Sequence, residues 1–449
     1  MKPDARTLFA NSAWSLVHQV VRVGALALIL LLLSRHFGPA RFGALVFGLA
    51  FVRIFGVVSV FGLDRILVRR FVEFPNESNQ LLHRAFRLKI GISLLAYTGL
   101  LAVVFVFDPR DLLALKIAAL AGGSFFFQSL DIFDYFFQAA HRFRLIFFGR
   151  SLPILIMTVV KLGAVFAGAS LLVFPALETV EAAVIGLSLF YVQRVTKPKP
   201  SLSQRCTTGN RELVSAGLPI LLGSLAVMLY MRSDILLLGR MAGLEAAGIY
   251  AAAAQITEGC ALFPMAFLPA VFPVLVRWRK LGLIQYEERF ANLLQAAILI
   301  GFGIAIGLSL SAPIVLRLLY GNAYVSAALI LGIHSWSAIF IYLSIMQSGY
   351  DIIEGLTWIA ATRVAAGASL NIVLNLLLIP RHGGAGAALA TLISQFCSSF
   401  LFNLFHRRTK RIFVLQLRAF LFIPLLHSMM RQLPNLRRSW DAGSFVAQE

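Results

Sequence analysis

Residues 31–50 read LLLSRHFGPARFGALVFGLA, and residues 236–255 read LLLGRMAGLEAAGIYAAAAQ. The second stretch repeats the first at a constant offset of 205 residues, matching three leucines and the pairs Arg35 with Arg240, Gly38 with Gly243, and Gly43 with Gly248. Weaker matches at nearly the same offset continue along both halves of the chain. The sequence therefore predicts two related halves, each with an arginine beside a glycine-containing turn that joins its first two helices.

The composition is that of a membrane protein. Of the 449 residues, 59% are hydrophobic and 13% are charged, and the mean hydropathy is +0.83. A soluble domain carries about 25% charged residues. Apolar runs of roughly 20 residues, the length that spans a bilayer as a helix, recur along the chain. We therefore expect an all-α polytopic membrane protein, and not a barrel, whose strands would alternate in shorter segments.

The apolar runs predict about twelve transmembrane helices. Six helices per copy is an even number, so the two halves share one topology, and parallel repeats are related by an axis along the membrane normal. The fold expected is two six-helix lobes. The predicted spans are 10–33, 40–63, 86–107, 112–139, 145–170, 171–193, 213–238, 244–274, 290–312, 324–349, 355–379 and 384–405.

Positive charge is distributed unevenly between the two sides of the membrane. The N-terminus, the even-numbered loops and the tail hold 28 of the 40 Lys and Arg residues, the other loops hold 7, and the rest lie in spans. By the positive-inside rule both termini are cytoplasmic. The same rule accounts for the net charge of +20 without nucleic acid as a partner. We expect a multi-pass membrane protein.

The predicted spans also divide the chain into regions. We expect an N-lobe at residues 1–195, a cytoplasmic linker at 196–212, and a C-lobe at 213–406. A basic tail follows at 407–449, and its apolar piece at 412–430 is interrupted by Arg418, Pro424 and His427. We interpret this piece as an interfacial or degenerate helix in preference to a thirteenth span.

Five cations lie at least six residues inside the ends of the predicted spans, where an ionisable side chain costs about 2.5–3.5 kcal/mol, and cations nearer the ends are counted with the loops. They are Arg22, Arg53, Lys161, Arg232 and Arg363. Residues of this kind persist where they face a wet cavity or a partner. We predict a cationic lumen that binds substrate through Arg22, Arg53, Arg363, Lys161 and His18.

Other polar positions in the spans leave two interpretations open. Asn11, Ser15, His18 and Arg22 follow at steps of 4, 3 and 4, which places them on one helical face. That face either lines the lumen or packs helices while Arg22 snorkels. The same choice, polar lumen or helix packing, holds for the pair Asn371 and Asn375, one turn apart.

Two carboxylates are candidates for coupling or gating. The repeat offset places Glu258 opposite Arg53, so these residues either pair across a shared axis or pack within their own lobes. Asp234, also in a span, is the second candidate proton carrier. Asp131 and Asp134 share a helical face, and we expect nearby arginines, among them Arg150, to neutralise them.

The sequence contains no recognisable catalytic, metal-binding or nucleotide-binding motif. The three cysteines form no C-x-x-C or metal spacing, and no phosphate-binding G-x-x-x-x-G-K-[ST] occurs. We therefore expect no enzyme activity, no metal and no cofactor.

Three stretches resemble a known family: SRHFGPARFGALVFGLAFVRIFGVVSVFGLDRILVRR, DILLLGRMAGLEAAGIYAAAAQITEGCALFPMAFLPAVFPVL, and SLNIVLNLLLIPRHGGAGAALATLISQF. They resemble bacterial polysaccharide flippases of the Wzx type, within the multidrug/oligosaccharidyl-lipid/polysaccharide exporter superfamily. The resemblance implies ion-coupled alternating access that moves an undecaprenyl-diphosphate-linked oligosaccharide across the bacterial inner membrane, where the protein is expected to reside. The partners implied are that lipid-linked substrate, membrane lipids, and a polysaccharide polymerase and glycosyltransferases. The tail departs from members with fourteen helices.

Three alternatives remain open at this point. A drug/cation antiporter of the same superfamily would need acidic groups in its lumen. A peptidoglycan-precursor flippase would need a positive lumen and usually has an extra helix pair. A non-transporting membrane assembly protein belongs to another class altogether.

Overall fold

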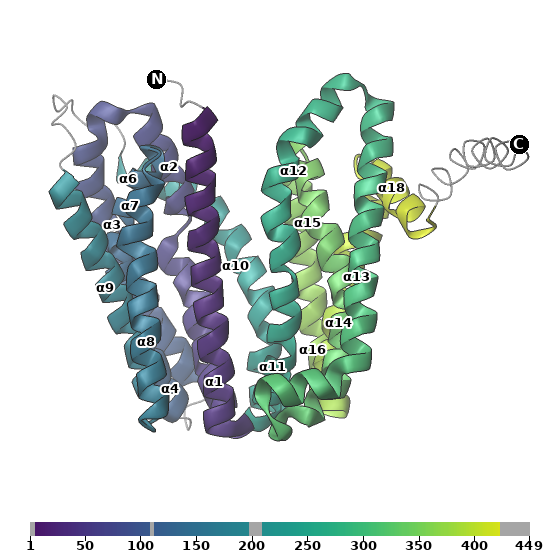
Figure 1. Cartoon of the computed structure of the whole chain (residues 1–449), viewed down its shortest axis with the longest axis horizontal. Coiled ribbons are helices and arrows are strands. Elements are labelled where there is room, and N and C mark those ends of the chain that lie inside the picture. The colour runs from purple at the N-terminus through teal and green to yellow at the C-terminus, as the bar shows by residue number, and fades with distance from the viewer. Residues whose placement is uncertain (1–4, 108–111, 197–208, 423–449) are drawn as a thin grey trace, which may run out of the picture. The chain divides into compact units, whose positions relative to one another are not determined.

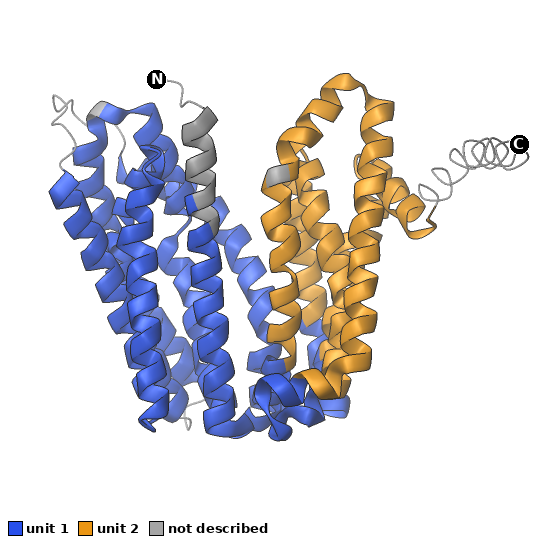
Figure 2. Cartoon of the chain, viewed as in Figure 1, with its two compact units in different colours: residues 1–252, 316–327, 372–387 blue, residues 253–315, 328–371, 388–449 orange. Residues whose placement is uncertain are grey.

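The structure is a computed structural model that describes residues 5–107, 112–196 and 209–422. Every regular element in these ranges is helical, which confirms the all-α prediction. Figure 1 shows long helices that run side by side within each part of the chain. The chain divides into two compact units, which Figure 2 distinguishes by colour. Unit 1 comprises Met1–Ala252, Leu316–Ala327 and Ile372–Ala387, and unit 2 comprises Ala253–Val315, Ala328–Asn371 and Ala388–Glu449.

Unit 1 contains most of the N-terminal helices. Its main elements are α1 (Ala5–Val60), α2 (Leu63–Glu73), α3 (Ser78–Phe107), α4 (Leu112–Gly122), α5 (Ser124–Phe127), α6 (Ile132–Ala139), α7 (Phe143–Ile146), α8 (Leu152–Phe166), α9 (Val173–Thr196), α10 (Asn210–Met241) and the first part of α11 (Leu244–Cys260). A π-helical turn, Phe147–Ser151, links α7 to α8.

Unit 2 is built around the C-terminal helices. Its elements include α12 (Leu262–Leu281), most of α13 (Leu283–Tyr320), α14 (Ala328–Ser335), α15 (Ser337–Ile353), most of α16 (Thr357–Phe396), a π-helical turn (Cys397–Leu401), α17 (Phe402–Phe405) and α18 (Lys410–Phe420). The helix α18 has 11 residues, fewer than the roughly 20 that span a bilayer. The rest of the predicted 412–430 piece lies outside the described residues.

The described residues contain nine or ten candidate spans, two of which are kinked, and this is compatible with about twelve helices. Nine helices there are long and apolar enough to cross a membrane, and one bent pair, Asn322–Ser335 with Ser337–Ile353, forms a further span. Two of the nine, which contain α1 and α16, each join two helices across a kink, at Gly38 and Gly383. The φ angles of Gly38 and Gly383 are positive, 72° and 53°, and residues that carry a Cβ rarely adopt such backbone angles.

The glycine turns of the sequence repeat have the same backbone role in both copies. Gly38 bends α1 between two spans, and its counterpart Gly243 has a φ of 95° between α10 and α11. These two turns are the elbows that the repeated sequence predicts.

The two copies also touch each other, within unit 1. A Cβ on Gly43 would lie 1.7 Å from the carbonyl oxygen of Leu244, and one on Gly248 would lie 2.1 Å from that of Pro39. Leu244 and Pro39 are themselves equivalent by the offset of 205 residues. The contact is therefore symmetric, with each glycine fitting against the start of the other copy's helix.

The compact units do not follow the predicted lobe boundaries. Contacts between α1 and α10 are extensive, so α10 belongs to the same unit as the N-terminal helices. Compactness and sequence repetition are different criteria, and the lobes at 1–195 and 213–406 stay predictions.

Candidate functional site

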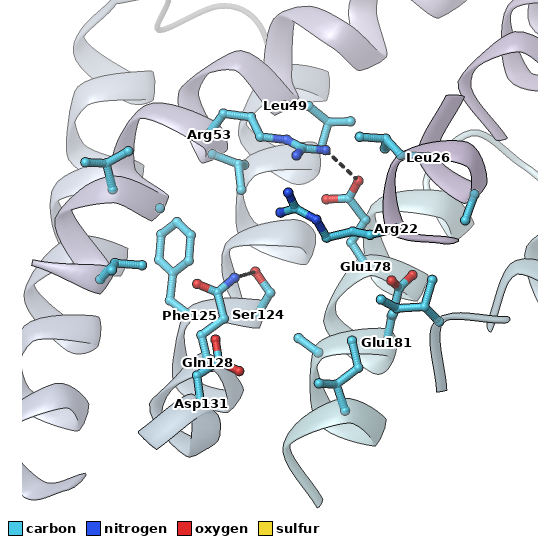
Figure 3. A pocket seen from close by; sticks show the side chains of 18 of the residues that line it. Arg22, Leu26, Leu49, Arg53, Ser124, Phe125, Gln128, Asp131, Glu178 and Glu181 are labelled. Atoms are coloured by element: carbon cyan, nitrogen blue, oxygen red, sulfur yellow. Dashed lines mark hydrogen bonds and ion pairs between the residues drawn. The ribbon is translucent and has the colours of Figure 1, made fainter. Parts of the chain in front are cut away.

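A cavity of about 650 Å³ with charged and apolar side chains in its lining lies within unit 1. Residues of α1, α2, α5, α8, α9 and α10 line it (Figure 3). Its charged lining consists of Arg22, Arg53, Arg65, Arg150, Lys161, Asp64, Asp131, Glu178 and Glu181. Five cations and four carboxylates leave a formal charge of +1 if all are ionised. These charged groups stand among many apolar lining residues, and their sum is much closer to neutral than that of the predicted cationic lumen.

Arg22 and Arg53 reach into the cavity from the two halves of α1. The kink at Gly38 separates these halves, so one helix delivers two arginines from different directions. Figure 3 shows both guanidinium groups converging near Glu178 of α9. The nearest Arg53 nitrogen is 3.8 Å from a Glu178 oxygen, longer than a hydrogen bond, while Arg22 donates to Gln19 at 3.0 Å.

Lys161 and Arg150 hold their carboxylates more closely. Lys161 of α8 donates to Glu181 of α9, and both side chains are largely buried. Arg150, in the π-helical turn, donates to Asp134 and lies 3.2 Å from Asp131. The predicted neutralisation of these aspartates is confirmed for Arg150. Arg150 also lines the cavity, so this π-helical turn contributes directly to the site, where such turns are often found.

Lys89 is a buried cation behind the cavity that the sequence analysis missed. Its side chain is fully buried in α3. Its ammonium group donates to the carbonyl of Gln128 at 2.9 Å and to the Tyr135 hydroxyl at 3.3 Å, and it also lies over the Tyr135 ring. The predicted span 86–107 begins three residues before Lys89, so the sequence places this cation near the membrane boundary and not deep in the bilayer. The signal that could have found it is the polar pair Ser93 and Gln128 facing the same region.

The polar stripe of the first helix is only partly described. The His18 ring shares a hydrogen bond of 2.7 Å with the hydroxyl of Ser151, and the tautomer of His18 decides which group donates. Ser151 is the residue after Arg150. Arg22, one turn after His18, lines the cavity. The side chains of Asn11 and Ser15 lie outside the described residues, so their placement stays a prediction.

Arg363 lies in unit 2, away from this cavity's lining. It is 7% exposed and donates to Asp351 at 3.1 Å and to Asn403 at 3.0 Å. Asn403 in turn bonds Gln347, which extends the buried network. These contacts favour a structural role, and a role in binding substrate stays a prediction.

The remaining predicted residues fall in both units. In unit 1, Asp234 accepts from Tyr250 at 2.5 Å and from Asn375 at 2.6 Å, so two predicted residues meet. In unit 2, Asn371 lies 3.4 Å from the hydroxyls of Thr391 and Ser394, as expected for helix packing. Glu258 is half-buried in unit 2, and its predicted pairing with Arg53 of unit 1 stays a prediction. Among the described residues, no group of three or more His, Cys, Asp or Glu side chains is placed to hold a metal ion.

Comparison with known proteins gives the family. Residues 8–278, more than half of the chain, match the family described as polysaccharide biosynthesis protein. The chain belongs to the polysaccharide biosynthesis protein family. This confirms the resemblance to polysaccharide flippases at the level of family. The cavity's charged lining lies entirely within the region that matches the family.

Among other members and relatives, the chain is similar to the uncharacterised membrane protein MJ1068 of Methanocaldococcus jannaschii. The two are 23% identical over 418 residues, covering 86% of this chain and 81% of the relative. A shorter match, 28% identical over 166 residues, joins it to the uncharacterised membrane protein YabM of Bacillus subtilis and covers 36% and 30% of the two chains.

Solved structures show the fold that this family member adopts. The lipid II flippase MurJ in an inward closed conformation aligns with a TM-score of 0.64 at 14% identity, covering 94% of this chain and 93% of MurJ. An inward-facing MATE transporter of the MOP superfamily aligns with a TM-score of 0.63 at 15% identity, covering 92% and 96%. A MOP superfamily transporter from Pyrococcus furiosus, described as having a binding pocket of reversed polarity, gives 0.61 at 14% identity, covering 90% and 95%. The family member therefore has the MOP superfamily fold.

Proposed function

We propose that this protein is a flippase that moves an undecaprenyl-diphosphate-linked oligosaccharide across the bacterial inner membrane by alternating access. The family and the fold support a transporter or flippase. The observation that carries the finer proposal is the convergence of Arg22 and Arg53 in a cavity with charged side chains in its lining, inside a membrane protein. Both termini lie in the cytoplasm in this proposal.

The chemistry of the cavity suits an anionic headgroup. A diphosphate and its sugars cannot cross hydrocarbon without a large desolvation cost, so the headgroup needs a wet, polar path. Arginine binds phosphate oxygens through two parallel hydrogen bonds. The polyprenyl tail stays in lipid while the head passes.

The carboxylates make the binding reversible. Glu178 is within 3.8 Å of Arg53 but is not hydrogen-bonded to it, so a diphosphate can displace it at low cost. When the substrate leaves, Glu178 is there to compensate the arginine again. A lumen with unpaired cations would bind the diphosphate but release it slowly. We propose Asp234 and Glu258 as the groups that couple this cycle to an ion.

The test is transport in proteoliposomes of a polyprenyl-diphosphate oligosaccharide carrying a fluorescent sugar, with an external quencher reporting the outer leaflet. We expect the double variant Arg22→Gln/Arg53→Gln to lower the initial rate at least tenfold. The matched control is Arg41→Gln, an exposed arginine at the elbow outside the cavity lining, which should keep the wild-type rate. Wild-type transport by the double variant would discard the proposal.

A second candidate, export of organic cations, has a specific observation in its favour. Four carboxylates line the same cavity, and a cation could displace the arginine or lysine that lies beside three of them, Asp131, Glu178 and Glu181. In that case Glu178→Gln/Glu181→Gln should abolish uptake of a fluorescent cation by the same proteoliposomes, and the arginine variants should not. If the wild type moves neither substrate, the protein is not a transporter of either kind and an assembly role remains.

A further inference from the structure

The C-terminal helix α18 has two faces of different character, and one of them is committed to unit 2. Ile412, Leu415 and Ala419 belong to the buried core of that unit. The rings of Phe413 and Phe420 contact Phe400, with centroid separations of 4.9 and 5.3 Å. This face of α18 is therefore not available to lipid.

A buried polar network fixes the orientation of α18. The Gln416 side chain donates to the Gln347 side chain at 2.8 Å and to the Ser399 carbonyl at 3.0 Å, and it accepts from Asn403 at 3.0 Å. Asn403 also accepts from Arg363. Rotating the helix would leave these buried polar groups without partners, at a cost of about 1–3 kcal/mol each. The opposite face of α18 is therefore fixed so that it points away from the core of unit 2.

The outward face is both basic and apolar, and we call it the tail surface. Arg407, Arg408, Lys410, Arg411 and Arg418 are exposed there, and so are Phe405, Val414, Leu417 and Leu421. Phe405 is 78% exposed and Leu421 57%. Val414, Leu417 and Leu421 follow at steps of 3 and 4, so they form one stripe along the helix. A helix that faces only water has no physical reason to expose such a stripe.

The tail surface begins where the last span ends. That span ends at Phe405, and the first exposed arginine of the surface is two residues later. Residues 404–422 contain five Lys or Arg residues and no Asp or Glu. Glu287 of α13 is 3.9 Å from Arg411, whose side chain is still 64% exposed. The surface therefore follows directly on the last span and keeps a net positive charge, since one carboxylate stands beside five cations.

We propose that the tail surface binds the headgroups of anionic phospholipids. Its apolar stripe enters the boundary between headgroups and acyl chains, and its cations contact the phosphates. Because unit 2 already holds the helix in place, lipid does not have to fold it. This proposal does not depend on what the protein transports.

The experiment compares lipid binding by full-length protein in detergent, using native mass spectrometry to count bound phosphatidylglycerol against phosphatidylcholine. The variant is Lys410→Gln/Arg411→Gln/Arg418→Gln. Each cation near a membrane surface is worth about a fivefold change in binding, so the affinity for phosphatidylglycerol should fall on the order of 100-fold. Raising the salt concentration should weaken wild-type binding in the same direction.

The matched control removes three exposed arginines elsewhere, Arg41→Gln/Arg317→Gln/Arg381→Gln. We expect it to retain wild-type binding, and we expect both triple variants to keep the wild-type melting temperature. Equal losses in both triple variants, undiminished phosphatidylglycerol binding by the α18 variant, or equal binding of phosphatidylcholine would each overturn the proposal. So would retention of undecaprenyl phosphate in place of phosphatidylglycerol, since that would assign the surface to the substrate.

Discussion

At the scale of single residues, the cations within the membrane differ in how firmly they are held. Arg150 bonds two aspartates, Lys161 bonds Glu181, and Lys89 is enclosed by Gln128 and Tyr135. Arg53 has only a long contact with its carboxylate. A buried cation that is hydrogen-bonded to a carboxylate stabilises the fold, whereas a cation with only a long contact to a carboxylate can bind a ligand. This distinction selects Arg22 and Arg53 as the proposed binding groups.

The first prediction concerns Arg150. Replacing Arg150 by Gln removes the cation that pairs with Asp134, whose side chain is 4% exposed. The carboxylate then keeps a hydrogen bond from the Gln138 side chain at 3.2 Å. Breaking a buried pair in this way costs about 3 kcal/mol. The thermal unfolding temperature in detergent should fall, and adding Asp134→Asn should recover part of the loss. A variant that is as stable as the wild type would show that Asp134 is protonated or hydrated instead.

The second prediction separates the two roles considered for Arg363. Its pairing with Asp351 inside unit 2 implies that Arg363→Gln lowers the unfolding temperature. The double variant Arg363→Gln/Asp351→Asn should be more stable than the single one, because no unpaired carboxylate remains. If Arg363→Gln instead unfolds like the wild type and loses transport, Arg363 belongs to the substrate path.

At the scale of elements, the glycine contact between the two copies is the tightest packing of helices in unit 1 for which a substitution can be judged. The third prediction is that Gly43→Ala and Gly248→Ala each lower the yield of folded protein, since a methyl group would meet a backbone carbonyl within about 2 Å. Gly91→Ala in α3 is the control, because nothing lies within 4 Å of its added Cβ. That substitution should be neutral or stabilising by up to about 1 kcal/mol. Size-exclusion profiles of the purified variants provide the comparison.

Much of the element order follows from the sequence because bilayer thickness fixes the length of an apolar run. The candidate spans, the elbows at Gly38 and Gly243, and a short amphipathic helix after the last span were all predictable for this reason. Partners were not. Glu178 and Glu181 lie about 125 and 20 residues from the cations they face, and no local pattern marks that pairing. Lys89 and Arg150 lie close to the starts of the predicted spans 86–107 and 145–170, and the ends of a predicted span are uncertain by about a turn, so the sequence does not decide whether either cation is buried.

At the scale of the whole molecule, the chain is strongly basic, but its cavity is not. The net charge of +20 is concentrated outside the spans, whereas the cavity lining carries five cations and four carboxylates. The surface charge sets orientation in the membrane and contacts with lipid. The cavity charge sets how tightly a substrate is held. The two properties can therefore be changed independently.

The fourth prediction follows from that separation. Glu178→Gln removes the carboxylate nearest Arg53 and leaves the surface charge unchanged, so the affinity for inorganic diphosphate should rise severalfold. Release should slow, and the turnover rate in proteoliposomes should fall although binding is tighter. Calorimetric titration and the transport assay together report both effects. Weaker diphosphate binding by this variant would mean that Glu178 orients Arg53 and does not compete for it.

The meeting of Gly43 with Gly248 has one more consequence. With main chain against main chain and no side chain between them, the two segments can roll over each other while their close van der Waals contact is kept, and drawing them apart would lose that contact. We therefore expect this place to act as a pivot, keeping its contact while the ends of the helices swing.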